Sequence, residues 1–133
     1  MLLLYKPIQM TNKMLKFVDI GQQNPPKRDK SQRKEDFGEI YQEFIHEKAK
    51  EQSSRCSQCG VPFCQVHCPL SNNIPDWLKL TAEGRYEEAY HLSQSTNNMP
   101  EVCGRICPQD RLCEGNCVIC LLYTSPSPRD GIG

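Results

Sequence analysis

The sequence lacks the features that would direct a chain to a membrane, to nucleic acid or out of the cell. No apolar run approaches the roughly 18 residues that a membrane-spanning helix requires. The apolar start at residues 1–5 is too short for the core of a signal peptide. The 16 basic and 16 acidic residues give a formal net charge of +0, so no basic excess attracts nucleic acid or an anionic surface. We therefore expect a cytoplasmic protein with no nucleic-acid partner and no membrane partner.

Strand patterns are also lacking, and the hydrophobic content is low. No stretch alternates apolar and polar residues as a half-buried strand does. The 133 residues, 38% of them hydrophobic, leave room for one small domain, whose core would gain from a staple such as a metal site. The expected fold class is mainly α, a small helical domain with loops.

Cysteine is abundant, and eight of the nine cysteines fall into two runs. The first run has spacings x2, x4 and x3 and precedes Pro69, and the second has spacings x3, x5 and x3. The runs consist of Cys56, Cys59, Cys64 and Cys68, then Cys103, Cys107, Cys113 and Cys117. Disulfides are rare in the reducing cytoplasm and would leave one of nine thiols unpaired. The runs therefore indicate metal or cluster ligands.

Two 4Fe-4S clusters account for the two runs, because each cluster takes four ligands, usually thiolates, around a common centre. A short loop can reach three corners of a cluster. In the bacterial ferredoxin run, the cysteine that precedes proline serves the other cluster. This rule predicts a first set of Cys56, Cys59, Cys64 and Cys103. It predicts a second set of Cys68, Cys107, Cys113 and Cys117.

Zinc is the alternative metal, since two four-cysteine zinc sites would use the same residues and would stabilise an interaction module without a redox role. Zinc ribbons favour paired C-x2-C elements, and only Cys56 and Cys59 form such a pair. Iron–sulfur clusters are brown, whereas zinc–thiolate is colourless. A visible absorption spectrum therefore distinguishes the two.

Helices are predicted on both sides of the first run. Apolar residues recur every three to four positions over residues 37–49, which predicts a helix that begins near Glu35. Further helices are expected over residues 76–83, 85–95 and 110–117. Asp76 is the expected N-cap of the first of these, and Gly84 its expected end.

Composition divides the chain into three parts. These are an extended lead-in over residues 1–34, a helical domain with two 4Fe-4S clusters over 35–119, and a tail over 120–133. The tail shifts abruptly to Ser, Pro and Gly, and we expect it to be non-native or disordered. Cys120 is accordingly not expected to be a ligand.

These motifs closely resemble one known domain, the N-terminal iron–sulfur domain of the glutamate synthase (NADPH) small subunit, which also opens dihydropyrimidine dehydrogenase. The resemblance rests on the first cysteine run, on Ile-Pro-Asp-Trp at 74–77 and on Asn97 through Cys117. It is strong over residues 56–119 and looser over 14–55. It implies two 4Fe-4S clusters that pass electrons from a flavin reduced by NADPH toward a second flavin site.

The resemblance also implies a partner and a larger protein. The partner would be the glutamate synthase large subunit or an equivalent redox protein. The family continues into FAD- and NADPH-binding domains, whereas this chain has no G-x-G-x-x-G after a strand. The chain is therefore expected to be a fragment of an oxidoreductase, with FAD and NADPH bound only in the missing C-terminal part. It is not expected to be active alone.

Overall fold

Helices and loops make up nearly all of the structure, a computed structural model that describes residues 14–119. Residues 1–13 and 120–133, with Cys120 and the predicted tail, lie outside the described residues. The elements are η1 (Lys16–Val18), α1 (Lys30–Glu35), α2 (His46–Ser53), α3 (Phe63–Val66), α4 (Ile74–Glu83), α5 (Tyr86–Gln94) and α6 (Pro100–Ile106). Extended backbone pairs only in an isolated antiparallel bridge, Lys27 to Tyr41, within this range. The predicted mainly α class is confirmed.

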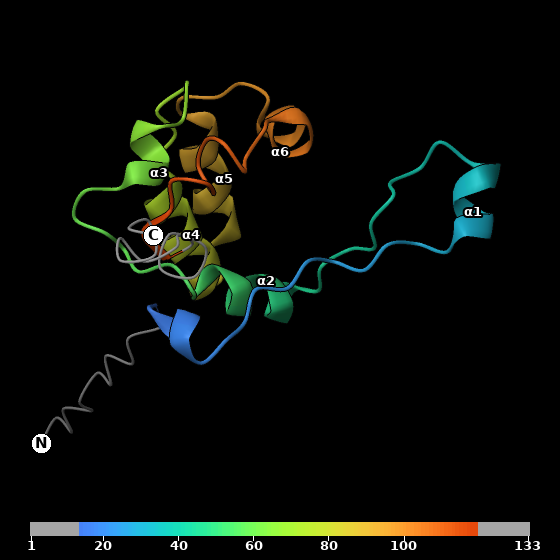
Figure 1. The fold of residues 1–133 in the computed structure, drawn as a ribbon, viewed down its shortest axis with the longest axis horizontal. Coiled ribbons are helices and arrows are strands. Elements are labelled where there is room, and N and C mark those ends of the chain that lie inside the picture. The colour runs from blue at the N-terminus through green and yellow to red at the C-terminus, as the bar shows by residue number, and fades with distance from the viewer. Residues whose placement is uncertain (1–13, 120–133) are drawn as a thin grey trace, which may run out of the picture.

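Helices α4 and α5 form a helical hairpin in the body of the molecule (Figure 1). Ala82 and Ala89 are buried, with 7% of each exposed, and their small side chains let the two helices approach closely. Gly84 ends α4 as predicted, with φ of 82°. Its N–H and that of Arg85 return to carbonyls of the last turn of α4. This turn brings α5 back alongside α4.

The start of α4 differs from the prediction. The helix begins at Ile74, and its N-cap is Asn73, which makes no side-chain capping bond. Asp76 lies in the first turn and accepts a hydrogen bond of 2.7 Å from the side chain of Asn73. Pro75 explains the earlier start, because its fixed φ suits the first turn of a helix and its missing N–H has no partner there.

Helix α2 packs against α4 and leads directly into the first cysteine run. The Tyr86 hydroxyl of α5 donates to the carbonyl of His46 at 3.0 Å, which ties the start of α2 to the hairpin. The segment around η1 also reaches the cysteine run, because the backbone N–H of Leu15 donates to the Cys56 carbonyl at 2.9 Å. Both α2 and this segment therefore hold the start of the first run in place.

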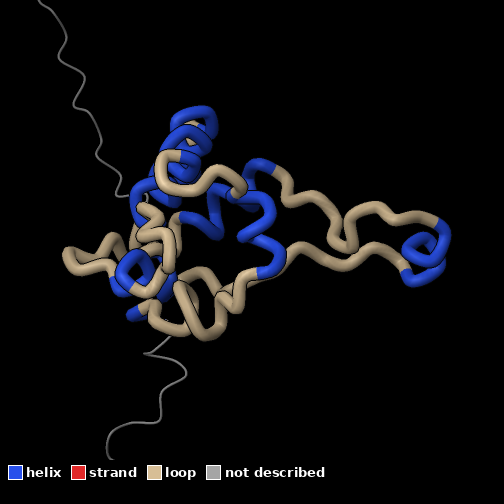
Figure 2. Tube along the Cα trace, turned by 90° about the horizontal axis from the view of Figure 1, so that it is seen from above, coloured by secondary structure: helices blue, strands red, loops and turns tan. Residues whose placement is uncertain are grey.

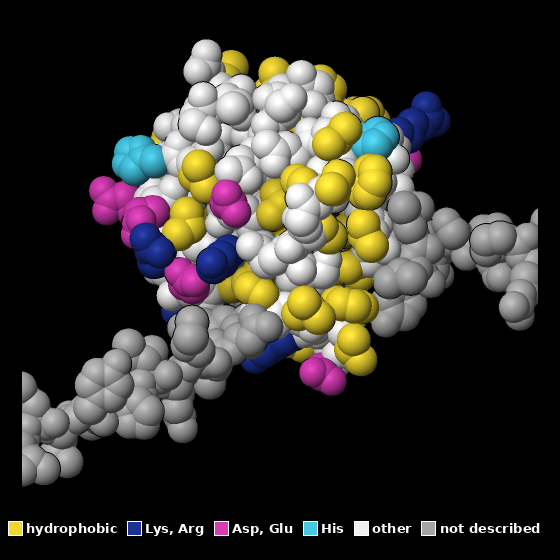
Figure 3. Space-filling view, turned by 90° about the vertical axis from the view of Figure 1, so that its left-hand side faces the viewer, with side chains coloured by type: hydrophobic (Ala, Val, Ile, Leu, Met, Phe, Trp, Pro, Cys, Tyr) yellow, Lys and Arg dark blue, Asp and Glu magenta, His cyan; other side chains and the backbone are white. Residues whose placement is uncertain are grey.

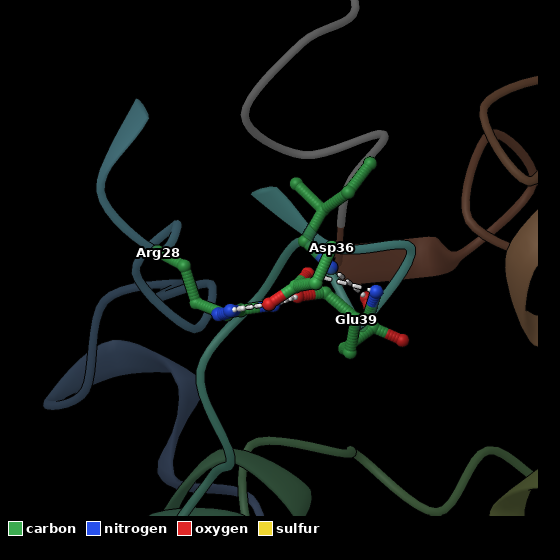
Figure 4. Close-up of polar contacts among 5 residues, drawn as sticks. Arg28, Asp36 and Glu39 are labelled. Atoms are coloured by element: carbon green, nitrogen blue, oxygen red, sulfur yellow. Dashed lines mark hydrogen bonds and ion pairs between the residues drawn. The ribbon is translucent and has the colours of Figure 1, made fainter. Parts of the chain in front are cut away.

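An arm of residues 21–45 extends from this body, with α1 at its tip (Figures 1 and 2). Arg28 fastens the two sides of the arm (Figure 4). Its guanidinium lies 2.6 Å from the Asp36 carboxylate and donates to the Glu39 carbonyl at 3.0 Å. The Glu39 carboxylate in turn lies 2.7 Å from Arg105 of α6, so the arm is tied back to the body.

The predicted helix beginning near Glu35 is wrong, because residues 36–45 form the returning side of the arm. Phe37 and Ile45 of its predicted apolar face are exposed. Asp36 accepts from the backbone N–H of Gly38, and Glu39 accepts from those of the next two residues. Such local side-chain bonds give the backbone an alternative to the helix, and Gly38 disfavours a helix interior by roughly 1 kcal/mol relative to Ala. The helix α2 starts only at His46.

The predicted helix over residues 110–117 is also wrong, since this stretch is a series of turns. The backbone N–H groups of Glu114 and Gly115 both donate to the Gln109 carbonyl, at 2.9 and 3.1 Å. A Cβ on Gly115 would lie 1.9 Å from the Asp110 carbonyl oxygen. The chain therefore crosses closely over itself here, and a glycine allows that approach.

The buried core is small. Its hydrophobic members are Met14, Ala82, Ala89 and Ile119, and no large side chain of residues 14–119 is fully buried. Hydrophobic side chains instead gather on the face of the molecule that carries α3 (Figure 3). Exposed apolar residues in and around α3 are Val61, Phe63, Val66 and Leu70. No helix formed by the described residues is long and apolar enough to cross a membrane.

Candidate metal centre

Short elements place the eight cysteines of the two runs. Cys56 and Cys59 lie in the loop after α2, Cys64 lies on α3, and Cys68 follows directly after it. In the second run, Cys103 lies on α6 and Cys107 is the C-cap of that helix. Cys113 and Cys117 lie in the turns that follow. All eight are partly buried free thiols.

Four thiols gather around Cys64, and we name them the Cys64 group. Its members are Cys56, Cys59, Cys64 and Cys117. Burial raises the pKa of the Cys64 thiol to about 11, and the backbone N–H of Gln65 partly opposes this rise. The charges of the other three sulfurs also raise it, which places them close to Cys64. A thiol with this pKa is protonated at neutral pH, so binding a metal or cluster here releases a proton.

The other four thiols gather after α3 and around α6, and we name them the Cys68 group. Its members are Cys68, Cys103, Cys107 and Cys113. Burial raises the pKa of Cys107, and the neighbouring sulfurs of Cys103 and Cys68 add to the rise. Burial also raises the pKa of Cys113, which again has Cys68 among its electrostatic neighbours. All four line one cavity of about 590 Å³.

Each thiol group draws on both runs, as the predicted ligand sets do, but Cys103 and Cys117 are exchanged relative to those sets. Cys103 precedes Cys107 by four residues on α6, and residues at this spacing share a face of a helix. Both sulfurs therefore belong to one group. Cys113 and Cys117 have the same spacing but lie in turns, so they reach different groups.

The Cys68 group surrounds a volume in which a cluster could be held. No group of three or more His, Cys, Asp and Glu side chains among residues 14–119 is arranged to hold one metal ion. The ligands of an iron–sulfur cluster surround a volume rather than a point, and the Cys68 group lines such a volume. Thiolate sulfur is also the usual protein donor to these clusters.

Two side chains between Cys56 and Cys59 were not predicted to act at the site. The Ser57 hydroxyl lies 2.9 Å from the Cys59 sulfur. The side-chain amide of Gln58 donates to the Cys56 sulfur at 3.4 Å and to the Pro75 carbonyl at 2.6 Å. Their position between Cys56 and Cys59 was the available signal, because hydrogen bonds to cluster sulfurs commonly come from polar residues of the ligand loop.

Trp77 lines the cavity of the Cys68 group. Its indole N–H donates to the side-chain oxygen of Asn72 at 2.9 Å. Asn72 is buried and donates in turn to the Ser93 carbonyl at 2.7 Å and the Thr96 hydroxyl at 3.0 Å. A satisfied polar network thus fixes one wall of the cavity.

The fold and the two thiol groups define a small iron–sulfur protein domain of the 4Fe-4S type. Residues 33–125 match the family described as dihydropyrimidine dehydrogenase domain II, 4Fe-4S cluster. This match covers more than half of the chain, and the chain belongs to that family.

Glutamate synthase [NADPH] small chains are among its close relatives. That of Azospirillum brasilense is 71% identical over 107 residues, which are 80% of this chain and 22% of the relative. That of Escherichia coli K12 is 51% identical over 110 residues, 83% of this chain and 23% of the relative. The putative oxidoreductase UacF of E. coli is 49% identical over 90 residues, 67% of this chain and 14% of the relative. The chain thus spans about a fifth of the small chains it matches.

Proposed function

We propose that the domain binds two 4Fe-4S clusters and relays electrons between them. The Cys64 group would hold one cluster and the Cys68 group the other, each through four thiolates. The observation that carries this proposal is that the eight thiols of the matched family segment gather in two groups of four. When bound, the clusters supply one-electron chemistry, and the residues of the chain set their positions and surroundings.

The wider reaction follows from the relatives. Because the glutamate synthase [NADPH] small chains are up to 71% identical, we infer that the electrons come from NADPH. They would pass through a flavin to these clusters and on to a glutamate synthase large subunit or an equivalent redox partner. FAD and NADPH would bind outside the residues of this chain, which supplies the relay and not the hydride chemistry. A reducing cytoplasm, which keeps thiols free, suits such a site.

Metal and sulfide analysis tests the proposal. We expect the chain, reconstituted anaerobically with iron and sulfide, to hold about eight iron atoms and as much acid-labile sulfide. It should be brown, and reduction by dithionite should give electron paramagnetic resonance signals of two centres. A matched control is the same preparation with zinc in place of iron and sulfide.

Zinc remains the second candidate, because four thiolates also suit a structural zinc site. A chain that takes up about two zinc atoms, stays colourless and gains no sulfide on reconstitution would contradict the relay function. It would instead support a zinc-stabilised interaction module.

A further inference from the structure

We propose that Ser57 and Gln58 tune the reduction potential of the Cys64 group. Their hydroxyl and amide donors, aimed at two of its sulfurs, would make a cluster held there easier to reduce than one held by the Cys68 group. This inference rests on the proposed function and adds to it which of the two centres has the higher potential.

Gln58 is fixed in the orientation that such a role requires. Its amide nitrogen lies 2.6 Å from the Pro75 carbonyl oxygen and 3.4 Å from the Cys56 sulfur. A carbonyl only accepts hydrogen bonds, so the nitrogen and not the oxygen of the amide must face Pro75. That nitrogen carries two hydrogens, and the second remains for the sulfur. Because Pro75 is buried in the first turn of α4, the anchor is rigid.

The backbone of Gln58 is also held in an uncommon conformation. Its φ of 52° is left-handed, which few residues with a side chain adopt. Such conformations persist where the surrounding contacts hold them, and they are concentrated at functional sites. The bond to Pro75 is such a contact, and it holds the residue between Cys56 and Cys59 with its amide against a sulfur.

Ser57 contributes the second donor. Its hydroxyl oxygen lies 2.9 Å from the Cys59 sulfur, and either atom can donate while Cys59 is a thiol. A sulfur that ligates a cluster is a thiolate and has no proton. In the loaded protein the Ser57 hydroxyl must therefore be the donor.

The Cys68 group has different surroundings. Backbone N–H groups bond a sulfur in each group, at Cys64 and at Cys113. In the described part of the chain, side-chain hydroxyl and amide donors are added to sulfurs of the Cys64 group and to none of the Cys68 group. The apolar residues Ile74, Trp77, Leu78 and Ala89 are part of the lining of the Cys68 cavity. Reduction adds a negative charge to a cluster. Donors to the sulfurs stabilise that charge, and apolar burial opposes it. An electron shared by the two centres would therefore reside mainly on the Cys64 group.

A potentiometric titration of the reconstituted full chain, followed by electron paramagnetic resonance, tests this inference. We expect Ser57→Ala and Gln58→Leu each to lower the reduction potential of the centre held by the Cys64 group. This centre is identified as the one whose signal is lost in Cys117→Ala. The double variant should lower its potential further, and the other centre should not shift. Two matched controls should leave both potentials unchanged. Ser95→Ala removes a hydroxyl that bonds the Leu92 carbonyl, and Gln65→Leu removes an amide beside Cys64 that bonds the Ser71 carbonyl.

The outcomes separate this inference from the proposed function. About eight irons per chain with unshifted potentials in both variants would overturn the tuning role and leave the relay intact. A shift in reduction potential confined to the centre of the Cys68 group, which keeps its signal in Cys117→Ala, would overturn the tuning role as well. If Gln58→Leu fails to take up iron, Ser57→Ala alone decides, because its hydroxyl bonds only the sulfur. A chain that binds no iron would overturn both proposals.

Discussion

At the scale of the residue, Cys103 and Cys117 determine how the two groups are built. Cys103 joins Cys107 because one turn of α6 places both sulfurs on the same side. Cys117 leaves Cys113 because the turns after Pro108 carry it across to Cys64. Each group therefore contains at least one cysteine from each of the two runs.

Double substitutions test this membership. Removing two ligands of one cluster should abolish one centre, whereas removing one ligand of each should abolish both. We therefore expect Cys64→Ala/Cys117→Ala to lose about four irons and Cys113→Ala/Cys117→Ala to lose about eight. Iron analysis and the number of paramagnetic centres measure the difference. Cys120→Ala is the control and should keep both centres. A Cys113→Ala/Cys117→Ala chain that keeps one centre would restore the division predicted from the sequence.

The sequence predicted the eight thiols and the place of Cys68, because their spacing and Pro69 are local features. It did not predict the partner of Cys103 or of Cys117. Which group each joins depends on whether two cysteines four residues apart lie along a helix or in turns. Cys103 and Cys107 lie along α6, whereas Cys113 and Cys117 have the same spacing in turns. The donors Ser57 and Gln58 were missed for a similar reason, since their contacts depend on Pro75 and on a left-handed backbone.

At the scale of the element, prediction succeeded for α4 and α5, although α4 starts earlier than predicted. Gly84 separates α4 from α5 by a left-handed turn that only glycine adopts readily. It failed over residues 36–45, where the apolar period is helical but Asp36, Gly38 and Glu39 bond locally instead. The short helix α6, which starts at Pro100 and contains Gly104, gave no apolar period that predicts it.

The turns over residues 108–117 should tolerate no side chain at Gly115. A Cβ there would meet the Asp110 carbonyl oxygen at 1.9 Å, and backbone atoms cannot move aside as a flexible side chain can. We expect Gly115→Ala to reduce the free energy of unfolding by about 2 kcal/mol or more. Thermal unfolding followed by circular dichroism measures it. Gly21→Ala, where nothing lies within 4 Å of the new Cβ, is the control and should change stability by less than about 0.5 kcal/mol. Equal stabilities of the two variants would show that the turns can open without cost.

The arm should loosen as the pH falls. The Arg28 guanidinium and the Gly38 backbone N–H lower the pKa of Asp36. The ionised form of this carboxylate therefore favours the arm with its two sides joined through Arg28, at pH values above the usual pKa of the group. That contribution is lost as the pH falls through the lowered pKa of the folded state. We expect Asp36→Asn to increase fast backbone motion over residues 28–40 at neutral pH, as measured by ¹⁵N relaxation.

The control for the arm is Glu35→Gln, which also removes one negative charge there but leaves the Arg28 network intact. Equal relaxation in the two variants would mean that charge count, and not the bonds of Asp36, orders the arm. Wild-type protein at acidic pH should approach the behaviour of Asp36→Asn.

At the scale of the whole molecule, the domain has little apolar core to hold it together. Its buried hydrophobic residues are few, and large side chains such as Phe37, Val18 and Ile106 are exposed. Composition predicted this shortage, but it could not show that some of the exposed apolar side chains would gather on the face that carries α3. Each proposed cluster would link segments distant in the sequence, which replaces part of that missing core.

Removal of the clusters should therefore largely unfold the domain. We expect chelation of the loaded chain under oxidising conditions to abolish most of the far-ultraviolet helical signal. The fluorescence of Trp77, the single tryptophan, should move to the wavelength of an exposed indole. Chelator added without oxidant, which leaves the clusters in place, is the control. A cluster-free chain that keeps its helix content would show that the α2, α4 and α5 packing suffices.

Each thiol group takes cysteines from both runs, and this fixes the order in which the two groups are completed during synthesis. When a ribosome has made the first run, three ligands of the Cys64 group and one of the Cys68 group exist. The Cys68 group is complete once Cys113 has been added, and the Cys64 group only after Cys117. If the thiols ligate as proposed, neither cluster can be fully bound while the hairpin of α4 and α5 is being made. Until the second run has been made, the nascent chain has thiols of the first run that no complete cluster can bind. Full cluster binding therefore follows synthesis of the second run.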